Sequence, residues 1–316
     1  ERKKALLTYL IATNPEYLIV DNVFGNLDIN SQDAIVKTLR SLSKKTSIIQ
    51  ITNRKGEILD FINITYQVQG KDLVLFDNIP KQKIKKTFIE SLPQPYKPNT
   101  TKFNPLIKFN NVNVIYGDRT IIKDICWEIK AGEFWQLVGP NGSGKSTILS
   151  LISGDNPKAF LQDITLFGVK KGSGESVWDI KKKIGYFSSE LMRGFRRSDS
   201  IENMVLSGFY DSIGLYKFPT DTQIILAHQW LHLLGMFGIK DKSFLSLSIG
   251  HQRLVLIARA MVKHPPLLIL DEPTNGLDDN NVELFSELIN KIASESETAI
   301  LYVSHRKEAG VLKPDF

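Results

Sequence analysis

Two short apolar runs, each followed by an aspartate, indicate two buried strands in this chain. Tyr17–Val20 precedes Asp21, and Leu267–Leu270 precedes Asp271. Continuous apolar runs of this length are typical of strands that are covered on both faces of a sheet. Helical patterns lie between these runs and further apolar strands. Because strands alternate with helices, the pattern favours an α/β fold with a parallel sheet.

The two runs belong to an internal repeat. Residues 12–21 align with residues 262–271 at an offset of 250, and residues 51–54 align with 303–306 at an offset of 252. Each copy reads helix, strand, turn, helix, strand. Residues 1 to about 77 therefore repeat the end of the chain, which predicts two units of the same fold.

Residues 78–105 have a different composition, with clustered lysines followed by four prolines between Pro93 and Pro105. Proline at this density is typical of a linker between domains. We therefore expect three parts: the C-terminal part of a first unit (1–77), a linker (78–105) and a nearly complete second unit (106–316).

The composition narrows the setting in which the protein works. The 316 residues carry a net charge of +6, which suits a nucleotide, a nucleic acid or an anionic membrane surface. Solvated lysine-rich helix faces explain the same charge, and we favour this interpretation. Cys126 is the one cysteine, so a reducing compartment fits best. No run approaches the roughly 18 apolar residues of a membrane helix, so we expect any membrane-spanning part to be a separate chain.

A glycine-rich segment lies between an apolar strand candidate (133–138) and a helical pattern. Its residues are, in order, Gly139, Pro140, Asn141, Gly142, Ser143, Gly144, Lys145, Ser146 and Thr147. This order fits G-x-x-x-x-G-K-[ST] between a strand and a helix, the context that a phosphate-binding loop requires. A glycine-rich hairpin turn is the alternative. We refer to residues 139–147 as the phosphate loop.

The residue types of the phosphate loop suit a polyphosphate. Glycines let backbone N–H groups surround phosphate oxygens, and the following helix directs its positive end at the same anion. Lys145 adds a charge for the β- and γ-phosphates, and the hydroxyl of Ser146 is a ligand for Mg²⁺.

Asp271 and Glu272 end the second buried strand. Because parallel α/β sheets bind ligands at the carboxyl ends of their strands, we expect both carboxylates to lie beside the phosphate loop. Asp271 is then a binding residue for Mg²⁺, and Glu272 orients or deprotonates the attacking water. Capping of the following helix is the alternative role.

The segment Leu247-Ser248-Ile249-Gly250 precedes an apolar helix. Ser248 and Gly250 present a hydroxyl and backbone donors to an anion, although helix capping explains the pair about equally well. The position of this segment shortly before Asp271 strengthens the functional interpretation.

The order of phosphate loop, Leu-Ser-x-Gly, Asp-Glu, Leu277-Asp278 and His305 resembles the ATP-binding cassette (ABC) family. The resemblance covers the second unit and, through the repeat, the first. It implies P-loop NTPase cassettes with a parallel core sheet, an antiparallel β-subdomain and a helical subdomain near 178–250. It also implies ATP and Mg²⁺ as cofactors, Tyr116 stacked on adenine, and His305 against the γ-phosphate. Without the resemblance, Tyr116 and His305 would be an ordinary core aromatic and an ordinary histidine.

Two stretches of the second unit, 167–181 and 206–216, resemble tandem-cassette proteins of the ModF or PhrA type. Such proteins are described as molybdenum-transport ATP-binding or photorepair proteins, with two cassettes in one chain and no membrane domain. The resemblance implies that the second cassette, or a homodimer mate, is a partner, and that separate membrane permease subunits are further partners. The location it implies is the cytoplasm, with peripheral attachment at the inner face of the membrane.

Three positions depart from the family pattern. The first unit has Asn22 at the place of Glu272 and Asn53 at the place of His305. An amide neither takes a proton from water nor carries an imidazolium charge. Ser189 occupies the place where the family has a glutamine that reaches toward Mg²⁺ and, in transporters, toward the membrane subunits. This departure makes conventional coupling to a membrane partner doubtful.

The repeat places Glu1 at the position of His251, so the first unit's own phosphate loop and Leu-Ser-x-Gly segment would precede it. We therefore expect the sequence to belong to a longer chain. The predicted activity is Mg²⁺-dependent ATP hydrolysis that energises a transport system of the molybdate type. The alternatives are a soluble ATPase that acts in repair or on translation complexes, and a regulatory ATP switch. The cluster Arg193, Arg196 and Arg197 fits solvated surface, and we expect no nucleic-acid partner.

Overall fold

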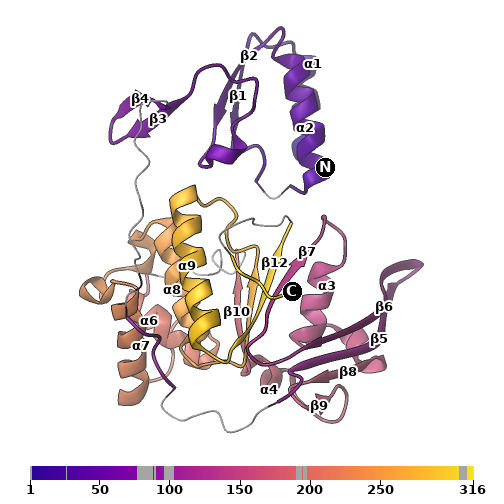
Figure 1. Cartoon of the computed structure of the whole chain (residues 1–316), viewed down its shortest axis with the longest axis vertical. Coiled ribbons are helices and arrows are strands. Elements are labelled where there is room, and N and C mark those ends of the chain that lie inside the picture. Colours follow the sequence, from indigo (N-terminus) through magenta and orange to yellow (C-terminus); the bar gives the residue numbers. More distant parts are fainter. Residues whose placement is uncertain are drawn as a thin grey trace. The chain divides into compact units, whose positions relative to one another are not determined.

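The computed structural model describes residues 2–25, 27–76, 88, 90–95, 103–189, 194, 198–305 and 312–316. The chain divides into two compact units (Figure 1). Unit 1 comprises Glu1–Thr87 with Asn275–Asn281, and unit 2 comprises Phe88–Thr274 with Val282–Phe316. Most of the predicted linker (78–105) lies outside the described residues, so its role stays a prediction.

Unit 1 alternates helices and strands before it ends in a hairpin. Its elements are α1 (Arg2–Ala12), β1 (Tyr17–Asp21), α2 (Ile29–Leu42), β2 (Ser47–Ile51), the 3₁₀ helix η1 (Lys55–Glu57), β3 (Tyr66–Gln69) and β4 (Asp72–Leu75). Strands β1 and β2 pair in parallel, and β3 and β4 pair antiparallel. Asp28 caps α2 because its carboxylate accepts a hydrogen bond from the N–H of Ser31 at 2.9 Å.

Unit 2 is built on two four-stranded sheets. The parallel sheet has the order β10-β11-β12-β7, with strands β7 (Phe134–Val138), β10 (Ile184–Ser188), β11 (Leu267–Asp271) and β12 (Ala299–Ser304). The antiparallel sheet has the order β6-β5-β8-β9, with strands β5 (Ile107–Tyr116), β6 (Arg119–Ile129), β8 (Asp163–Leu166) and β9 (Val169–Lys170). The parallel core and the antiparallel β-subdomain confirm the expected fold class.

The helices of unit 2 complete that fold. They are α3 (Lys145–Ile152), η3 (Pro157–Leu161), α4 (Val177–Lys181), α6 (Ile201–Leu206), η4 (Ser207–Tyr210), α7 (Asp221–Leu233), η5 (Phe237–Ile239), η6 (Phe244–Ser246), α8 (Ile249–Met261) and α9 (Asp279–Glu295). The helices from α6 to η6 lie within the range 178–250 where the resemblance implied a helical subdomain. No helix in the described part of the chain is long and apolar enough to cross a membrane.

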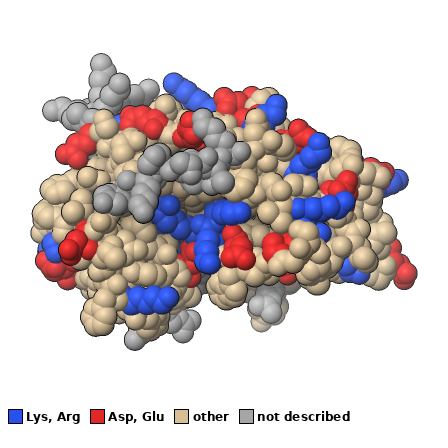
Figure 2. Space-filling view, turned by 90° about the horizontal axis from the view of Figure 1, so that it is seen from below, with Lys and Arg blue, Asp and Glu red and all other residues tan. Residues whose placement is uncertain are grey.

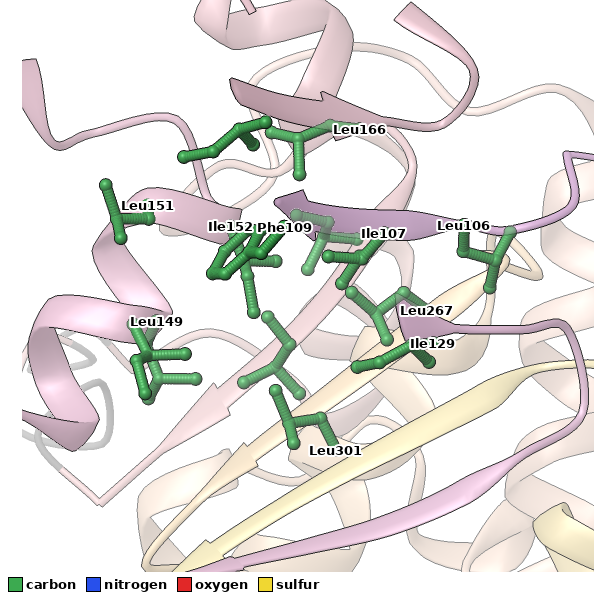
Figure 3. Packing of buried hydrophobic residues seen from close by; sticks show 14 of the residues in the cluster. Leu106, Ile107, Phe109, Ile129, Leu149, Leu151, Ile152, Leu166, Leu267 and Leu301 are labelled. Carbon is green, nitrogen blue, oxygen red and sulfur yellow. The ribbon is translucent and has the colours of Figure 1, made fainter. Parts of the chain in front are cut away.

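The core of unit 2 fills the space between α3, the antiparallel sheet and the parallel sheet. Figure 3 shows Leu149 and Ile152 of α3 beside Phe109 of β5, with Leu267 and Leu301 of the central strands in the same cluster. The opposite face of the parallel sheet meets α9, where the rings of Phe187 and Phe285 lie 6.3 Å apart. Helices α3 and α9 therefore cover opposite faces of the sheet (Figure 1).

Two buried cations fix the helical subdomain to α8. Arg259 donates from Nε to Ser207 Oγ at 3.0 Å and from Nη2 to the carbonyl of Ser212 at 2.9 Å. Burial lowers the pKa of the Arg259 guanidinium to about 10, and the nearby carboxylate of Asp211 opposes that shift. Lys263, two residues after the end of α8, pairs with Asp211. These contacts hold η4 and the turn after it against the last two turns of α8.

The repeat recurs in the backbone as well as in the sequence. Asn22 and Glu272, which are 250 residues apart, have φ angles of 44° and 48°. The hydroxyl of Thr46 donates to the carbonyl of Pro15 at 2.9 Å, and that of Thr298 donates to the carbonyl of Pro265 at 2.9 Å. Equivalent positions therefore have the same local geometry even where the residue type has changed.

One expectation about β1 is wrong, because the strand is covered on only one face. Tyr17 and Ile19 are each 64% exposed, whereas their counterparts Leu267 and Ile269 in β11 are fully buried. In unit 2 that face packs against α3. In the described part of unit 1 no helix occupies the corresponding place, and the apolar cluster lies on the other face of β1, around Leu18 and Val20.

The repeat offers a matched pair of substitutions for this difference. We expect Ile269→Ala to lower the free energy of unfolding of unit 2 by about 2–5 kcal/mol, because it leaves a cavity in a packed core. We expect Ile19→Ala, at the exposed equivalent position, to change the stability of unit 1 by about 0.5 kcal/mol or less. Hydrogen exchange of peptides from β11 and β1 measures each effect in its own unit. Equal losses at both positions would show that the exposed face of β1 is covered in solution.

Candidate functional site

The parallel sheet brings four predicted site segments to one edge. Its strands pair in register, with Ser188 beside Asp271, Asp271 beside Val303, and Ser304 beside Val138. The residues that follow these strand ends therefore lie next to one another at the carboxyl edge of the sheet. They are Ser189 after β10, Glu272 after β11, His305 after β12 and Gly139 after β7.

The phosphate loop depends on two glycines with left-handed backbone angles. Gly142 has a φ of 79° and Gly144 a φ of 93°. A Cβ atom at Gly144 would lie 3.3 Å from the carbonyl oxygen of Ile121, so a larger residue would be strained as well as crowded. This turn lets α3 begin at Lys145, immediately after the loop.

The loop offers several groups to a ligand. Pro140, Asn141, Gly142, Ser143 and Ser146 are exposed to solvent, while Gly139, Gly144 and Thr147 are partly buried. Backbone N–H groups at the start of a helix attract anions, since they lack partners within the helix. The open face of the loop therefore suits a phosphate group.

Lys145 lies folded against its own loop. It is 8% exposed, and its Nζ donates to the carbonyls of Gly139 at 2.6 Å and Pro140 at 2.9 Å. The same Nζ lies 3.3 Å from Nδ1 of His305. Because an ammonium group only donates, Nδ1 accepts in this contact and the ring proton resides on Nε2.

Glu272 completes this chain of contacts. The Nε2 atom of His305 donates to Oε1 of Glu272. The backbone of Glu272 is also fixed, since its N–H donates to the carbonyl of Val303 on the neighbouring strand at 2.9 Å. The structure thus joins Lys145, His305 and Glu272, three residues from separate parts of the sequence, at the carboxyl edge of the sheet.

The oxygen ligands at this edge fit magnesium. Ser146 offers an exposed hydroxyl and Asp271 a partly buried carboxylate, and hard oxygen ligands of this kind are those that Mg²⁺ prefers. No group of three or more histidine, cysteine, aspartate or glutamate side chains that could hold a metal occurs among the described residues. This arrangement suits an ion that keeps its waters and shares a phosphate ligand, and it does not suit a closed protein cage.

Tyr116 ends β5 and is 45% exposed. Its hydroxyl lies 3.0 Å from Nδ2 and 3.2 Å from Oδ1 of Asn156. The Nζ atom of Lys158 lies over the ring, 6.0 Å from its centroid. An exposed, anchored aromatic ring is consistent with the predicted stacking on a nucleobase.

Ser248 and Gly250 lie at the start of α8. Ser248 Oγ lies 2.8 Å from Nδ1 of His251 and accepts from the N–H of that residue at 3.4 Å, so Ser248 caps the helix. Gly250 is buried. These contacts stay within the first turn of α8 and do not join the pair to the phosphate loop. Their predicted role toward a nucleotide remains a prediction, as does that of Ser189, which is partly buried.

Sequence reasoning missed two residues that organise the site. Arg253, on α8, is 4% exposed and donates from Nη1 to the carbonyl of Pro273, immediately after Glu272. Its one sequence signal is a charged residue within an apolar helix. Asn156 is 4% exposed and holds Tyr116. No pattern in the sequence indicates that contact.

Several positive charges of the described region are paired with carboxylates. Figure 2 shows lysine and arginine side chains next to aspartate and glutamate side chains over one face. The lysines with acidic partners include Lys108, Lys170, Lys171, Lys181, Lys182, Lys240, Lys263 and Lys291. This pairing supports the interpretation of the charge as solvated surface. Arg193, Arg196 and Arg197 lie outside the described residues.

The sequence of this chain is similar to those of known proteins. The family model described as ABC transporter matches residues 122–275. ModF of Escherichia coli, an ABC transporter ATP-binding protein, is 41% identical over 98% of this chain and 66% of its own length. ZurA of Listeria innocua, a zinc uptake system ATP-binding protein, is 36% identical over 64% of this chain and 77% of its own length.

A solved structure agrees with these relatives. The cbiO1 protein of Clostridium perfringens, part of the ABC transporter complex cbiONQ, superposes with a TM-score of 0.56 at 28% identity. The match covers 64% of this chain and 79% of that protein. The present chain spans 66% of ModF and 64% of an uncharacterized ABC transporter ATP-binding protein of Schizosaccharomyces pombe, which is 31% identical.

Proposed function

This chain belongs to the ABC transporter family of ATP-binding proteins, and on that premise we propose that unit 2 binds MgATP in its phosphate loop and hydrolyses it. One observation carries the proposal. Lys145, His305 and Glu272 come from three segments and meet at the carboxyl edge of the sheet, where the phosphate loop begins. A cation that binds the phosphates and a carboxylate that orients the attacking water are recurring parts of enzymes that transfer a phosphoryl group to water, and the family resemblance adds the imidazole.

Each residue has a role in this reaction. The N–H groups of the loop bind the β- and γ-phosphates, and Lys145 turns from the carbonyls of Gly139 and Pro140 to the same oxygens. Ser146 and Asp271 hold Mg²⁺, which neutralises charge on the phosphates when it is bound. Glu272 orients the attacking water and takes its proton, while His305 donates from Nε2 to the γ-phosphate.

The proposal extends to the organisation of the whole protein. Residues 1–77 are the C-terminal part of a first cassette, 78–105 a linker and 106–316 a second cassette. In the full-length protein, each ATP lies between the phosphate loop of one cassette and the Leu-Ser-x-Gly segment of the other, so Ser248 and Gly250 contact the nucleotide of the first cassette. The matching backbone of the repeat supports the assignment of both units to the same cassette fold.

We infer that ATP turnover energises a transport system of the molybdate type through separate permease subunits. The similarity to ModF and to zinc uptake ATP-binding proteins supports a role in transport. The protein would then work in the cytoplasm, at the inner face of the membrane when the permease is bound. Ser189, where the family has glutamine, favours the alternative of a soluble ATPase in repair or a regulatory ATP switch. Co-purification with membrane proteins, compared with salt-sensitive retention on DNA, separates these roles.

The phosphate-loop assignment predicts the effect of Lys145→Ala. We expect the affinity for ATP to fall about 10- to 100-fold, because a hydrogen bond to a charged group is worth about 1.5–3 kcal/mol. Isothermal titration calorimetry on the folded variant measures the change. Lys170→Ala removes an exposed lysine that pairs with Asp163 and is the matched control. Unchanged affinity in the Lys145 variant would refute the assignment.

The role of Glu272 predicts that Glu272→Gln retains ATP and loses turnover. The amide keeps the size of the side chain and a hydrogen bond, but it is not a base. A general base contributes about 10²–10⁴-fold in rate, so we expect a loss of that size in the full-length protein. Glu283→Gln, at an exposed position of α9, controls for the loss of one negative charge. Turnover at the parental rate would exclude Glu272 as the catalytic carboxylate.

The first unit has Asn22 at the place of Glu272 and Asn53 at the place of His305. We therefore predict that the two ATP sites of the tandem protein are unequal in activity. The site that contains the phosphate loop of residues 139–147 has Glu272 and His305 and hydrolyses ATP. The site of the first cassette binds ATP and turns it over slowly. We therefore expect Glu272→Gln to remove nearly all activity of the full-length protein. Asn22→Glu with Asn53→His, added to that variant, restores both missing groups and should raise turnover. If about half the activity survives Glu272→Gln alone, both parental sites are active and the asymmetry is wrong.

A further inference from the structure

Asn156 is a buried amide with a partner for each polar group. It follows α3 and is 4% exposed. Its Oδ1 accepts from the N–H of Lys158 at 3.0 Å, and its Nδ2 donates to Ser150 Oγ at 3.0 Å. Its backbone N–H donates to the carbonyl of Ser150, also at 3.0 Å. Because a buried polar group is costly to leave unsatisfied, this network fixes the orientation of the amide.

The fourth contact of this amide reaches Tyr116. The tyrosine hydroxyl is within hydrogen-bond distance of both Nδ2 and Oδ1 of Asn156, at 3.0 Å and 3.2 Å. The ring of Tyr116 is otherwise largely open, since the residue is 45% exposed at the end of β5. Without Asn156, the side chain of Tyr116 would be free to change its rotamer about the Cα–Cβ bond, and the ring would lose its fixed position.

Lys158 determines which face of the ring is free. Its N–H is held by Asn156, and its ammonium group lies over one face of Tyr116, 6.0 Å from the centroid. With this cation over one face, the other face of the ring is the one that we assign to a planar ligand. The same amide thus fixes the hydroxyl end of the ring and the backbone of Lys158, whose ammonium group attracts the ring through a cation–π contact.

The network also joins the ring to the phosphate loop. Ser150 is on α3, the helix that begins at Lys145. The amide of Asn156 is therefore a direct link between the helix that carries the phosphate-binding lysine and the aromatic ring at the end of β5. The covalent chain of a nucleotide limits the distance between its base and its phosphates, so a fixed distance between ring and helix favours its binding.

We propose that Asn156 is a positioning residue that holds the Tyr116 ring in the position from which it stacks on the base of the bound nucleotide. This proposal rests on the proposed function, in which ATP binds at the phosphate loop. Asn156 does not touch the nucleotide and acts through the hydroxyl of Tyr116. It contributes to the affinity for the base and leaves the affinity for the phosphates unchanged.

The test compares two ligands that differ in the base. MgATP and magnesium tripolyphosphate are titrated into the 316-residue chain and its Asn156→Ala, Tyr116→Phe and double variants. We expect either single substitution to weaken ATP about three- to tenfold, the value of one net hydrogen bond, because each removes the same contact. The double variant should be no weaker than the single variants. Tripolyphosphate affinity should stay at the parental value in all three.

A matched control separates this role from general loosening of the fold. Gln162→Ala removes a different amide of the same region, which accepts from the N–H of Asn113 on β5 at 2.9 Å and does not bond to Tyr116. We expect this variant to bind both ligands like the parent. Tyr116→Phe keeps the ring and tests the same hydrogen bond if Asn156→Ala fails to fold.

Three results would overturn the proposal: unchanged ATP affinity in the Asn156 or Tyr116 variant, an equal loss for tripolyphosphate, or additive losses in the double variant. Failure of the proposed function itself gives a different pattern. In that case Lys145→Ala leaves both ligands unaffected, or the parent binds neither.

Discussion

The in-register parallel pairing of β10, β11, β12 and β7 is the constraint on which the site depends. It ends all four strands at one edge, so residues far apart in sequence become neighbours without any loop having to reach across the molecule. The helices and the antiparallel sheet keep this pairing intact by covering both faces. A one-residue slip of β12 would turn its buried side chains to the other face and move His305 away from Lys145.

Much of this arrangement could be predicted because it depends on local patterns. The phosphate loop has a fixed residue spacing, and a buried strand that ends in two carboxylates is visible in the sequence. Contacts between distant segments could not be predicted in this way. The links from Arg253 to Pro273 and from Asn156 to Tyr116 depend on how helices pack on sheets, and the exposed face of β1 depends on what is absent beside it. The domain boundaries, and the roles of Ser189, Ser248 and Gly250 toward a nucleotide, stay predictions.

Equivalent positions of the repeat can share their backbone geometry and differ in their side-chain chemistry. Asn22 and Glu272 adopt the same left-handed angle after equivalent strands, and each N–H donates to the carbonyl of the adjacent strand, at 3.0 Å and 2.9 Å. Asparagine tolerates this angle better than glutamate does, so the amide costs the first unit little in folding. The difference between the two positions therefore lies in proton transfer and not in stability.

The contact of Lys145 with the carbonyls of its own loop has a consequence for exchange of nucleotide. These carbonyls accept hydrogen bonds from the same ammonium group that the proposed function assigns to phosphate oxygens, so the two sets of oxygens compete for it. Lys145 must break these hydrogen bonds before it binds a polyphosphate, and the free energy of breaking them lowers the affinity for that ligand. Under the proposed function, return of the lysine to these carbonyls after loss of the terminal phosphate would favour release of the diphosphate.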